Sequence, residues 1–184
     1  MSYLSIKLEA AKRAMVKDRP LRAIAFPDFH SDDLLEIALT DPCTLNEMDF
    51  SKLEQEQRER EYRRLAYLGD ALIDSVLADF LYSTGHDLTK ADFDDWRQAL
   101  VNKHGLTHFA IKLGLPDYSS SWNRKNRKLP KNEPRIWGEM FEAVVGVLFL
   151  DADRNFDNVA QWLCDRFLRD AIAAYENAHP PMMS

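Results

Sequence analysis

Two pairs of carboxylates interrupt otherwise apolar segments of the chain. Asp70 and Asp74 are four residues apart within LGDALIDSVL, and Glu139 and Glu142 are three residues apart at the start of EMFEAVVGVLFL. Residues at either spacing lie on the same face of a helix. Ionised acids beside leucine and valine are costly to bury unless another group compensates their charge. The spacing therefore indicates that four acids on two helices could converge on one site.

Such a set of carboxylates suits a hard divalent cation. Mg²⁺ takes oxygen ligands in octahedral geometry and keeps several waters, so a few protein carboxylates suffice when phosphate oxygens add the rest. The bound ion lowers the pKa of a water and neutralises charge that develops on a phosphodiester. The alternative is an ordinary surface role. An acid near a helix N-terminus interacts favourably with the helix dipole, which alone explains Glu139, and Asp74 is equally a solvated position.

A basic segment lies between the two acid-bearing runs. From Trp122 to Arg135 the chain has six Lys and Arg residues against a single acid, although its formal net charge is −6. Pro130 and Pro134 exclude a continuous helix, so we expect an exposed loop. Cations in such a loop suit the phosphates of RNA, while a merely solvated surface is the alternative. The residues that we expect to bind RNA are Arg124, Lys125, Arg127, Lys128 and Lys131.

Other chemistries find little support in the sequence. His104 and His108 are four residues apart, but Gly105 lies between them and no third ligand is near, so we do not expect a zinc site. The phosphate-binding loop, nucleophile elbow and dinucleotide motifs do not occur. Cys43 and Cys164 have no partner at metal-ligand spacing, and we interpret both as reduced thiols.

The elements that must position the acids are helical. A chain of 184 residues with 46% hydrophobic residues can build one substantial core, and its apolar residues recur at three- and four-residue spacing. We therefore predict an all-α fold, with a polar loop over residues 43–51. The predicted helices cover residues 32–40, 52–84, 89–105, 106–114, 136–151 and 156–178.

Three regions are expected along the chain. Residues 1–27 form a helical extension with its connector, residues 28–175 form the main domain, and residues 176–184 form a frayed tail. The N-terminus has no uninterrupted apolar core before a cleavage site, and no stretch approaches about 20 apolar residues. We expect a protein of the cytoplasm that has no membrane partner, or of a plastid if the source is a eukaryote.

Four segments of the chain together resemble the ribonuclease III family. The signature helix of that family, ERLEFLGDAVL, is similar to RRLAYLGDALID, and its L-x-x-A-L-T-H-P-S segment is similar to LLEIALTDPC. Two further segments, DDWRQALVNKHGLTHFAIKLGL and GEMFEAVVGVLFLD, resemble later family motifs. The four occur in the family's order over about residues 32–175. The resemblance implies an all-α ribonuclease III endonuclease domain that is dimeric and has a valley for duplex RNA.

The resemblance also assigns roles to three of the acids. Family metal sites draw carboxylates from the two signature helices, and Asp70, Glu139 and Glu142 occupy such positions. We therefore expect these three to be catalytic and to bind Mg²⁺, with Mn²⁺ as a substitute and Asp74 as an auxiliary.

Two residues of the first signature helix depart from the family pattern. Ala66 and Arg63 stand where the family has glutamates. The form A-Y-x-G-D-A at residues 66–71 instead resembles the compact Mini-ribonuclease III branch, which lacks a separate RNA-binding domain. That branch also has an acid at the position of Asp74 and a similar basic loop, although it normally lacks an acid at the position of Glu139. We expect a catalytic domain alone, similar to that branch or to a divergent bacterial or plastid relative.

Two functions remain open from the sequence. One is a Mg²⁺-dependent endoribonuclease for double-stranded or structured RNA, such as ribosomal RNA precursors, which leaves 5′-phosphate and 3′-hydroxyl ends. The other is an inactive relative that binds structured RNA or a ribonucleoprotein, with Ala66 marking a degraded site. A helical protein-interaction module leaves the ordered run of family segments unexplained. For the homodimer, we expect contacts from the apolar run AVVGVLFL and its Gly146.

Overall fold

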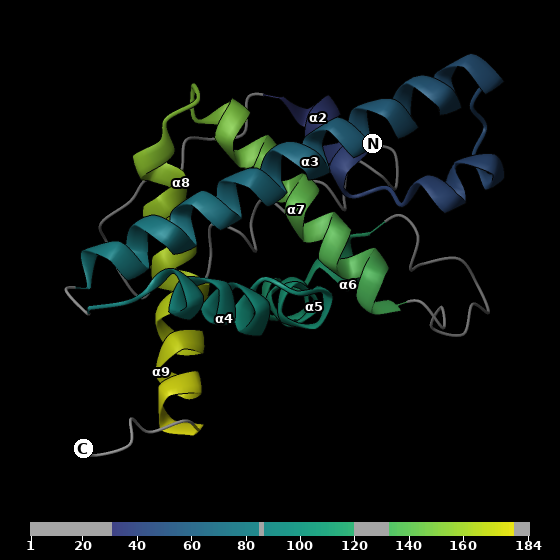
Figure 1. Cartoon of the computed structure of the whole chain (residues 1–184). Coiled ribbons are helices and arrows are strands. Elements are labelled where there is room, and N and C mark those ends of the chain that lie inside the picture. Colours follow the sequence, from purple (N-terminus) through teal and green to yellow (C-terminus); the bar gives the residue numbers. More distant parts are fainter. Residues whose placement is uncertain (1–30, 85–86, 120–132, 179–184) are drawn as a thin grey trace.

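The computed structural model describes residues 31–84, 87–119 and 133–178. These ranges hold helices joined by short connections and no strand, so the predicted all-α class is confirmed (Figure 1). None of their helices is long and apolar enough to cross a membrane. The predicted extension over residues 1–27 lies outside the described residues.

The long helix α3 (Lys52–Ser83) forms the spine of the domain. It begins at a capping box in which the Ser51 hydroxyl accepts from the Glu54 N–H and the Glu54 carboxylate accepts from the Ser51 N–H. Its first turns are charged and exposed, whereas its second half buries an apolar stripe that includes Leu65, Ile73 and Leu77. The prediction of a helix that changes from solvated to buried is confirmed.

Two short elements precede this spine. Helix α2 (Asp32–Ala38) is followed by a 3₁₀ helix, η1 (Pro42–Glu47), which the Asp41 side chain starts by accepting from the Cys43 N–H at 3.0 Å. The prediction of a polar loop over residues 43–51 is therefore partly wrong. Leu45 is buried in this segment and anchors it to the domain, which the polar composition conceals.

The helix predicted over residues 89–105 is in fact divided. Helix α4 (Lys90–Leu100) ends before Asn102, whose side chain accepts from the N–H groups of His104 and Gly105 and starts α5 (Lys103–Leu113). A Cβ on Gly105 would lie 2.1 Å from the carbonyl oxygen of Leu100, so this sharp turn requires glycine. Our prediction missed Asn102 as a helix N-cap.

The core lies where α5 and the later helices meet α7 (Glu133–Asp151). A short helix, α6 (Leu115–Tyr118), follows α5 after Gly114, which has a positive φ of 78°. Helix α8 (Phe156–Leu163), a π-helical segment (Cys164–Leu168) and α9 (Arg169–Ala178) then form one column at the side of the domain (Figure 1). An aromatic cluster joins these parts and contains Phe109, Phe141, Trp162 and Phe167.

The apolar run of α7 belongs to the core of a single chain. Val144, Val145 and Val147 are fully buried, and Leu148 is 1% exposed. A Cβ on Gly146 would lie 2.3 Å from the carbonyl oxygen of Leu65, so this glycine admits α3 and not a second subunit. The prediction that AVVGVLFL and Gly146 contribute to a homodimer interface is therefore wrong for residues 143–148, whereas Phe149 and Leu150 at the end of the run are only partly buried. The apolar pattern of this run indicates that it is buried, but it does not indicate whether another helix of the same chain or a second subunit covers it.

Candidate active site

The two helices that carry the four acids, α3 and α7, cross one another (Figure 1). Two glycines allow this crossing to be close. A Cβ on Gly69 of α3 would lie 1.8 Å from the carbonyl oxygen of Glu142 in α7, and a Cβ on Gly146 of α7 would lie 2.3 Å from the carbonyl oxygen of Leu65 in α3. No real Cβ tolerates so short a contact. Since Asp70 follows Gly69 in the chain, the close approach sets Asp70 of one helix near Glu142 of the other.

Asp70 and Glu142 have no contacting counterion among the described residues. Within the residues that the structure describes, neither carboxylate accepts a hydrogen bond or forms an ion pair at contact distance. Burial, together with the neighbouring charges of Asp70 and Glu139, raises the pKa of Glu142 to about 8. Burial and then Asp74 raise the pKa of Asp70, against a weaker lowering by Arg97. A cation placed between the two carboxylates would relieve both the burial cost and the repulsion.

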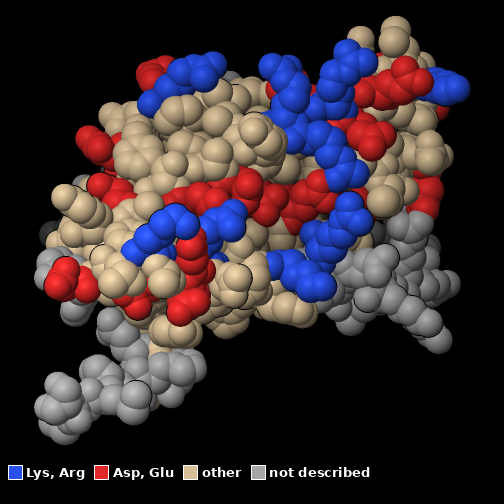
Figure 2. Space-filling view, in the orientation of Figure 1, with Lys and Arg blue, Asp and Glu red and all other residues tan. Residues whose placement is uncertain are grey.

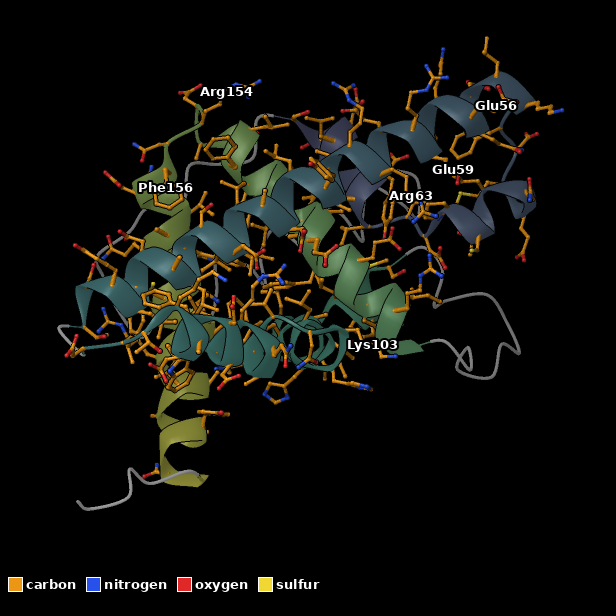
Figure 3. All side chains as sticks on the ribbon, in the orientation of Figure 1. Glu56, Glu59, Arg63, Lys103, Arg154 and Phe156 are labelled. Carbon is orange, nitrogen blue, oxygen red and sulfur yellow. The ribbon has the colours of Figure 1, made fainter. Side chains whose placement is uncertain are left out.

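The other two acids each have an arginine. The Arg63 guanidinium of α3 donates to the Glu139 carboxylate of α7. Arg97 of α4 holds Asp74 through both oxygens, with its Nε at 2.9 and 2.8 Å and its Nη2 at 2.7 Å. Figure 3 shows the Arg63 side chain reaching from α3 toward α7. The structure thus brings all four acids to one region but neutralises only two of them.

The donor set of this region fits a hard cation. In the described part of the chain, no three His, Cys, Asp or Glu side chains gather closely enough to surround a metal ion by themselves. Two carboxylates nevertheless suit Mg²⁺, which commonly takes one or two of them and completes its shell with water and substrate phosphates. Glu139 could join Asp70 and Glu142 only after release by Arg63. Metal binding by these three acids stays a prediction.

Ala66, which stands where the family pattern has a glutamate, lies close to Asp70 on α3. Ala66 is buried, with only 4% of its surface exposed, on the turn of α3 that precedes Asp70. Of the two acids that α3 brings to the crossing, Asp74 is paired with Arg97. Asp70 has no contacting cation among the described residues. The neighbouring Arg63 adds a positive charge at a position where the family resemblance leads us to expect a negative one.

The predicted RNA-binding residues cannot be placed. Arg124, Lys125, Arg127, Lys128 and Lys131 lie within residues 120–132, outside the described part of the chain. Figure 2 shows another arrangement of charge, in which Asp and Glu form a band across this face with Lys and Arg on both sides of it.

Two of the described cations lie beside the acids. Lys103 and Arg135 line a hollow together with Glu139 and Glu142. Arg135 is the last cation of the basic segment, for which the sequence predicted no specific role, and Lys103 was not predicted as a site residue. The available signal was the position of Lys103 directly after the Asn102 cap.

The fold and the site together define a class of protein, an all-α domain with two acids on each of two helices that cross closely. Residues 63–153 match the Ribonuclease III domain, a span that contains α3, the crossing and nearly all of α7. This region of the chain is therefore a ribonuclease III domain.

Curated relatives agree with this assignment. Ribonuclease 3 of Oceanobacillus iheyensis is 29% identical over 145 residues, which cover 79% of this chain and 60% of the relative. Ribonuclease 3 1 of a Nostoc species is 32% identical over 131 residues, which cover 71% of this chain and 54% of the relative. The chain thus spans between half and about three fifths of the length of these relatives.

A solved structure shares the fold. The nuclease domain of ribonuclease III from Campylobacter jejuni superposes with a TM-score of 0.59 at 22% sequence identity, covering 94% of this chain and 99% of that domain. Its description refers to structural flexibility in a region involved in dimer formation, which is a property of that protein. At this level of identity, the likeness concerns the arrangement of the helices.

Proposed function

We propose that this protein is a Mg²⁺-dependent endoribonuclease that cleaves double-stranded or structured RNA. The observation that carries the proposal is the pair Asp70 and Glu142, two half-buried carboxylates that lie near one another at a close helix crossing and have no contacting counterion among the described residues. Structural acids are normally paired or solvated. The ribonuclease III domain and the relatives named Ribonuclease 3 support the same reading.

The two proposed metal ligands come from two different helices, Asp70 from α3 and Glu142 from α7. Asp70 and Glu142 would hold Mg²⁺ or Mn²⁺, which supplies an activated water and neutralises charge on the phosphodiester when bound. The crossing at Gly69 sets the separation of these ligands, because the absence of a side chain at Gly69 lets the two helix backbones lie close together. Glu139 retains Arg63 at the edge of the site, where the guanidinium can also meet a phosphate.

Further parts of the proposal follow the family resemblance. The products would carry 5′-phosphate and 3′-hydroxyl ends, and a precursor of ribosomal RNA would be one substrate. The protein would act as a homodimer in the cytoplasm, and the cations of residues 124–131 would contact RNA phosphates. Because residues 143–148 are buried within one chain, the dimer contacts would come from other residues.

Cleavage of a long RNA duplex tests the proposal. Wild type is incubated with the duplex in the presence and absence of Mg²⁺, beside Asp70→Asn and Glu142→Gln. Asp79→Asn is the matched control, because Asp79 is an exposed acid nine residues along α3 and therefore faces the opposite side of the helix. We expect Mg²⁺-dependent cleavage by wild type and by the control alone. Equal cleavage by all four proteins would contradict the assignment of the site.

A second candidate is an RNA-binding protein without nuclease activity. The observations that favour it are the buried Ala66 and the capture of Glu139 by Arg63, which together leave few free ligands. It predicts that wild type binds the duplex and leaves it intact with Mg²⁺ or Mn²⁺. The cleavage experiment therefore distinguishes the two candidates directly.

A further inference from the structure

A hollow opens beside the carboxylates, between the start of α5 and the first half of α7. Its volume is about 260 Å³. It shares Glu139 and Glu142 with the candidate active site, and Figure 3 places Lys103 beside the N-terminal half of α7. The residues that line it are Val101, Lys103, Leu106, Arg135, Gly138, Glu139 and Glu142.

The charged side chains of this hollow differ in whether they have a partner among the described residues. Lys103 and Arg135 are exposed, and among the residues that can be described neither has a carboxylate partner. Some other cations of the domain are paired, as Arg97 is with Asp74 and Lys112 is with Asp170. Since Glu139 in the wall is already paired with Arg63, the two free cations can act on a ligand from outside.

The remaining lining leaves room for more than an ion. Val101 and Leu106 supply apolar surface, and Gly138 has no side chain to fill the space. A Cβ on Gly138 would lie 3.4 Å from both the Leu106 Cβ and the Lys103 carbonyl oxygen. The hollow therefore has two cations and an apolar side beside the two acids that it shares with the candidate active site, and such a lining suits a sugar phosphate better than a free metal ion.

The start of α5 is not itself the anion site. The Asn102 side chain accepts from the His104 N–H at 2.8 Å and from the Gly105 N–H at 3.1 Å, so these groups are already occupied. Binding of an anion therefore depends on the Lys103 and Arg135 side chains, which substitution can remove without touching the helix cap.

We propose that this hollow is a phosphate subsite for the nucleotide adjacent to the cleaved bond of the RNA strand. Lys103 and Arg135 bind the backbone phosphate of that nucleotide, while Val101 and Leu106 contact its sugar. The inference rests on the proposed function and deepens it. Because the hollow and the metal site share Glu142, one strand with successive phosphates can occupy both, whereas an isolated phosphate can occupy only one.

Duplex binding tests the two cations directly. Lys103→Gln, Arg135→Gln and the double variant are compared with wild type, with metal omitted so that no cleavage intervenes. Arg154→Gln is the control, because it removes the same charge beyond the other end of α7 (Figure 3). For each cation removed we expect weaker binding and a salt dependence shallower by about 0.9 in log–log slope. Arg154→Gln keeps the wild-type slope.

A small-molecule probe tests the spacing of the two sites. We expect adenosine 3′,5′-bisphosphate to inhibit Mg²⁺-dependent cleavage by wild type about tenfold more strongly than adenosine 5′-monophosphate, since two sites are then filled at once. In the double variant this preference disappears, and the KM for duplex RNA rises more than kcat falls.

The outcomes separate the subsite from the proposed function. If wild type cleaves the duplex but the two cation variants bind it like Arg154→Gln, the subsite is wrong and the function stands. If wild type shows no preference for the bisphosphate, the hollow does not take the adjacent phosphate. A wild-type protein that neither binds nor cleaves the duplex overturns both proposals.

Discussion

Two kinds of acid meet at the crossing of α3 and α7, and their surroundings differ although their sequence context is alike. Asp74 and Glu139 each contact an arginine, whereas Asp70 and Glu142 contact none among the described residues. Each helix contributes one acid of each kind. Paired acids are held in place by their partners, while unpaired acids are stabilised only if a ligand arrives. The comparison therefore identifies which carboxylates are available for chemistry.

The largest expected effect comes from removing the unpaired acids. Asp70→Asn or Glu142→Gln should lower the rate of duplex cleavage by about a hundredfold or more, because each deletes a charge that the ion requires. Asp74→Asn should lower it far less, since Arg97 already neutralises that carboxylate. Single-turnover cleavage rates provide the measurement. An equal loss for Asp74→Asn and Asp70→Asn would remove the distinction between the two kinds of acid.

A change at the crossing should affect both kinds of acid at once. In Gly69→Ala the new Cβ would meet the Glu142 backbone, and we expect a loss of about 3 kcal/mol in the free energy of unfolding together with loss of cleavage. Gly138→Ala is the matched control, because its Cβ would have contacts of 3.4 Å and should cost less. Chemical denaturation measures both. Similar stability of the two variants would mean that the helices separate easily.

The unpaired acids should also make the metal-free protein sensitive to pH. Because folding raises the pKa of Glu142 from 4.5 to about 8, the folded chain binds this proton more tightly than the unfolded chain does. The resulting stability is full below pH 4.5 and is lost as the pH rises through 8. Without metal, the Tm of wild type should therefore fall across this range more than the Tm of Glu142→Gln.

Divalent metal should reverse that dependence. Binding of the ion requires the ionised carboxylate, so the apparent affinity for Mg²⁺ should increase from pH 6 to pH 8. A titration followed by thermal unfolding measures it. A constant Mg²⁺ affinity over this interval would argue that Glu142 is not a ligand.

Converting a paired acid to an unpaired one should have a smaller effect. In Arg63→Gln the Glu139 carboxylate is released, and we expect the Mg²⁺ concentration for half-maximal cleavage to fall about threefold as a third carboxylate becomes available. Arg64→Gln is the control, since Arg64 is exposed and pairs with Glu61 on its own helix. An unchanged Mg²⁺ requirement with a raised KM would instead assign Arg63 to the RNA.

The smallest expected effect concerns the pair between Arg97 and Asp74. Arg97→Gln removes a contact between α4 and α3, but the Arg97 side chain is 54% exposed and solvent screens the interaction. We expect a loss of at most about 1 kcal/mol in the free energy of unfolding. Thermal unfolding at low and high salt measures it, and a loss that is independent of salt would indicate a packing role in place of an electrostatic one.

Several features of this domain were accessible from local sequence. The capping box at Ser51, the apolar stripe of α3 and the αL glycine at Gly114 act within a few residues of the chain. For the same reason the all-α class and the position of Asp70 within a buried helix were predicted correctly. The boundary between α4 and α5 also depends on local residues, Asn102 and Gly105. We did not predict it, because the helical spacing of apolar residues continues across the boundary.

The sequence could not predict in the same way which helix covers each apolar face. The run AVVGVLFL is equally suited to a core and to a dimer interface, because hydrophobicity is not directional. Only the contact of Gly146 with Leu65 decides that α3 occupies this face. The position of Lys103 after the Asn102 cap likewise does not assign it to a site, since its charged neighbours in the hollow come from α7.

By itself the sequence determined that acids would interrupt two buried helices, because residue type and helical period are local properties. The tertiary structure alone decided which acids remain without a contacting cation. Arg63 lies 76 residues from Glu139 and Arg97 lies 23 residues from Asp74, so both ion pairs depend on how separate helices pack. The close crossing at Gly69 then leaves Asp70 and Glu142 facing one another, since backbone contact fixes the distance between the helices.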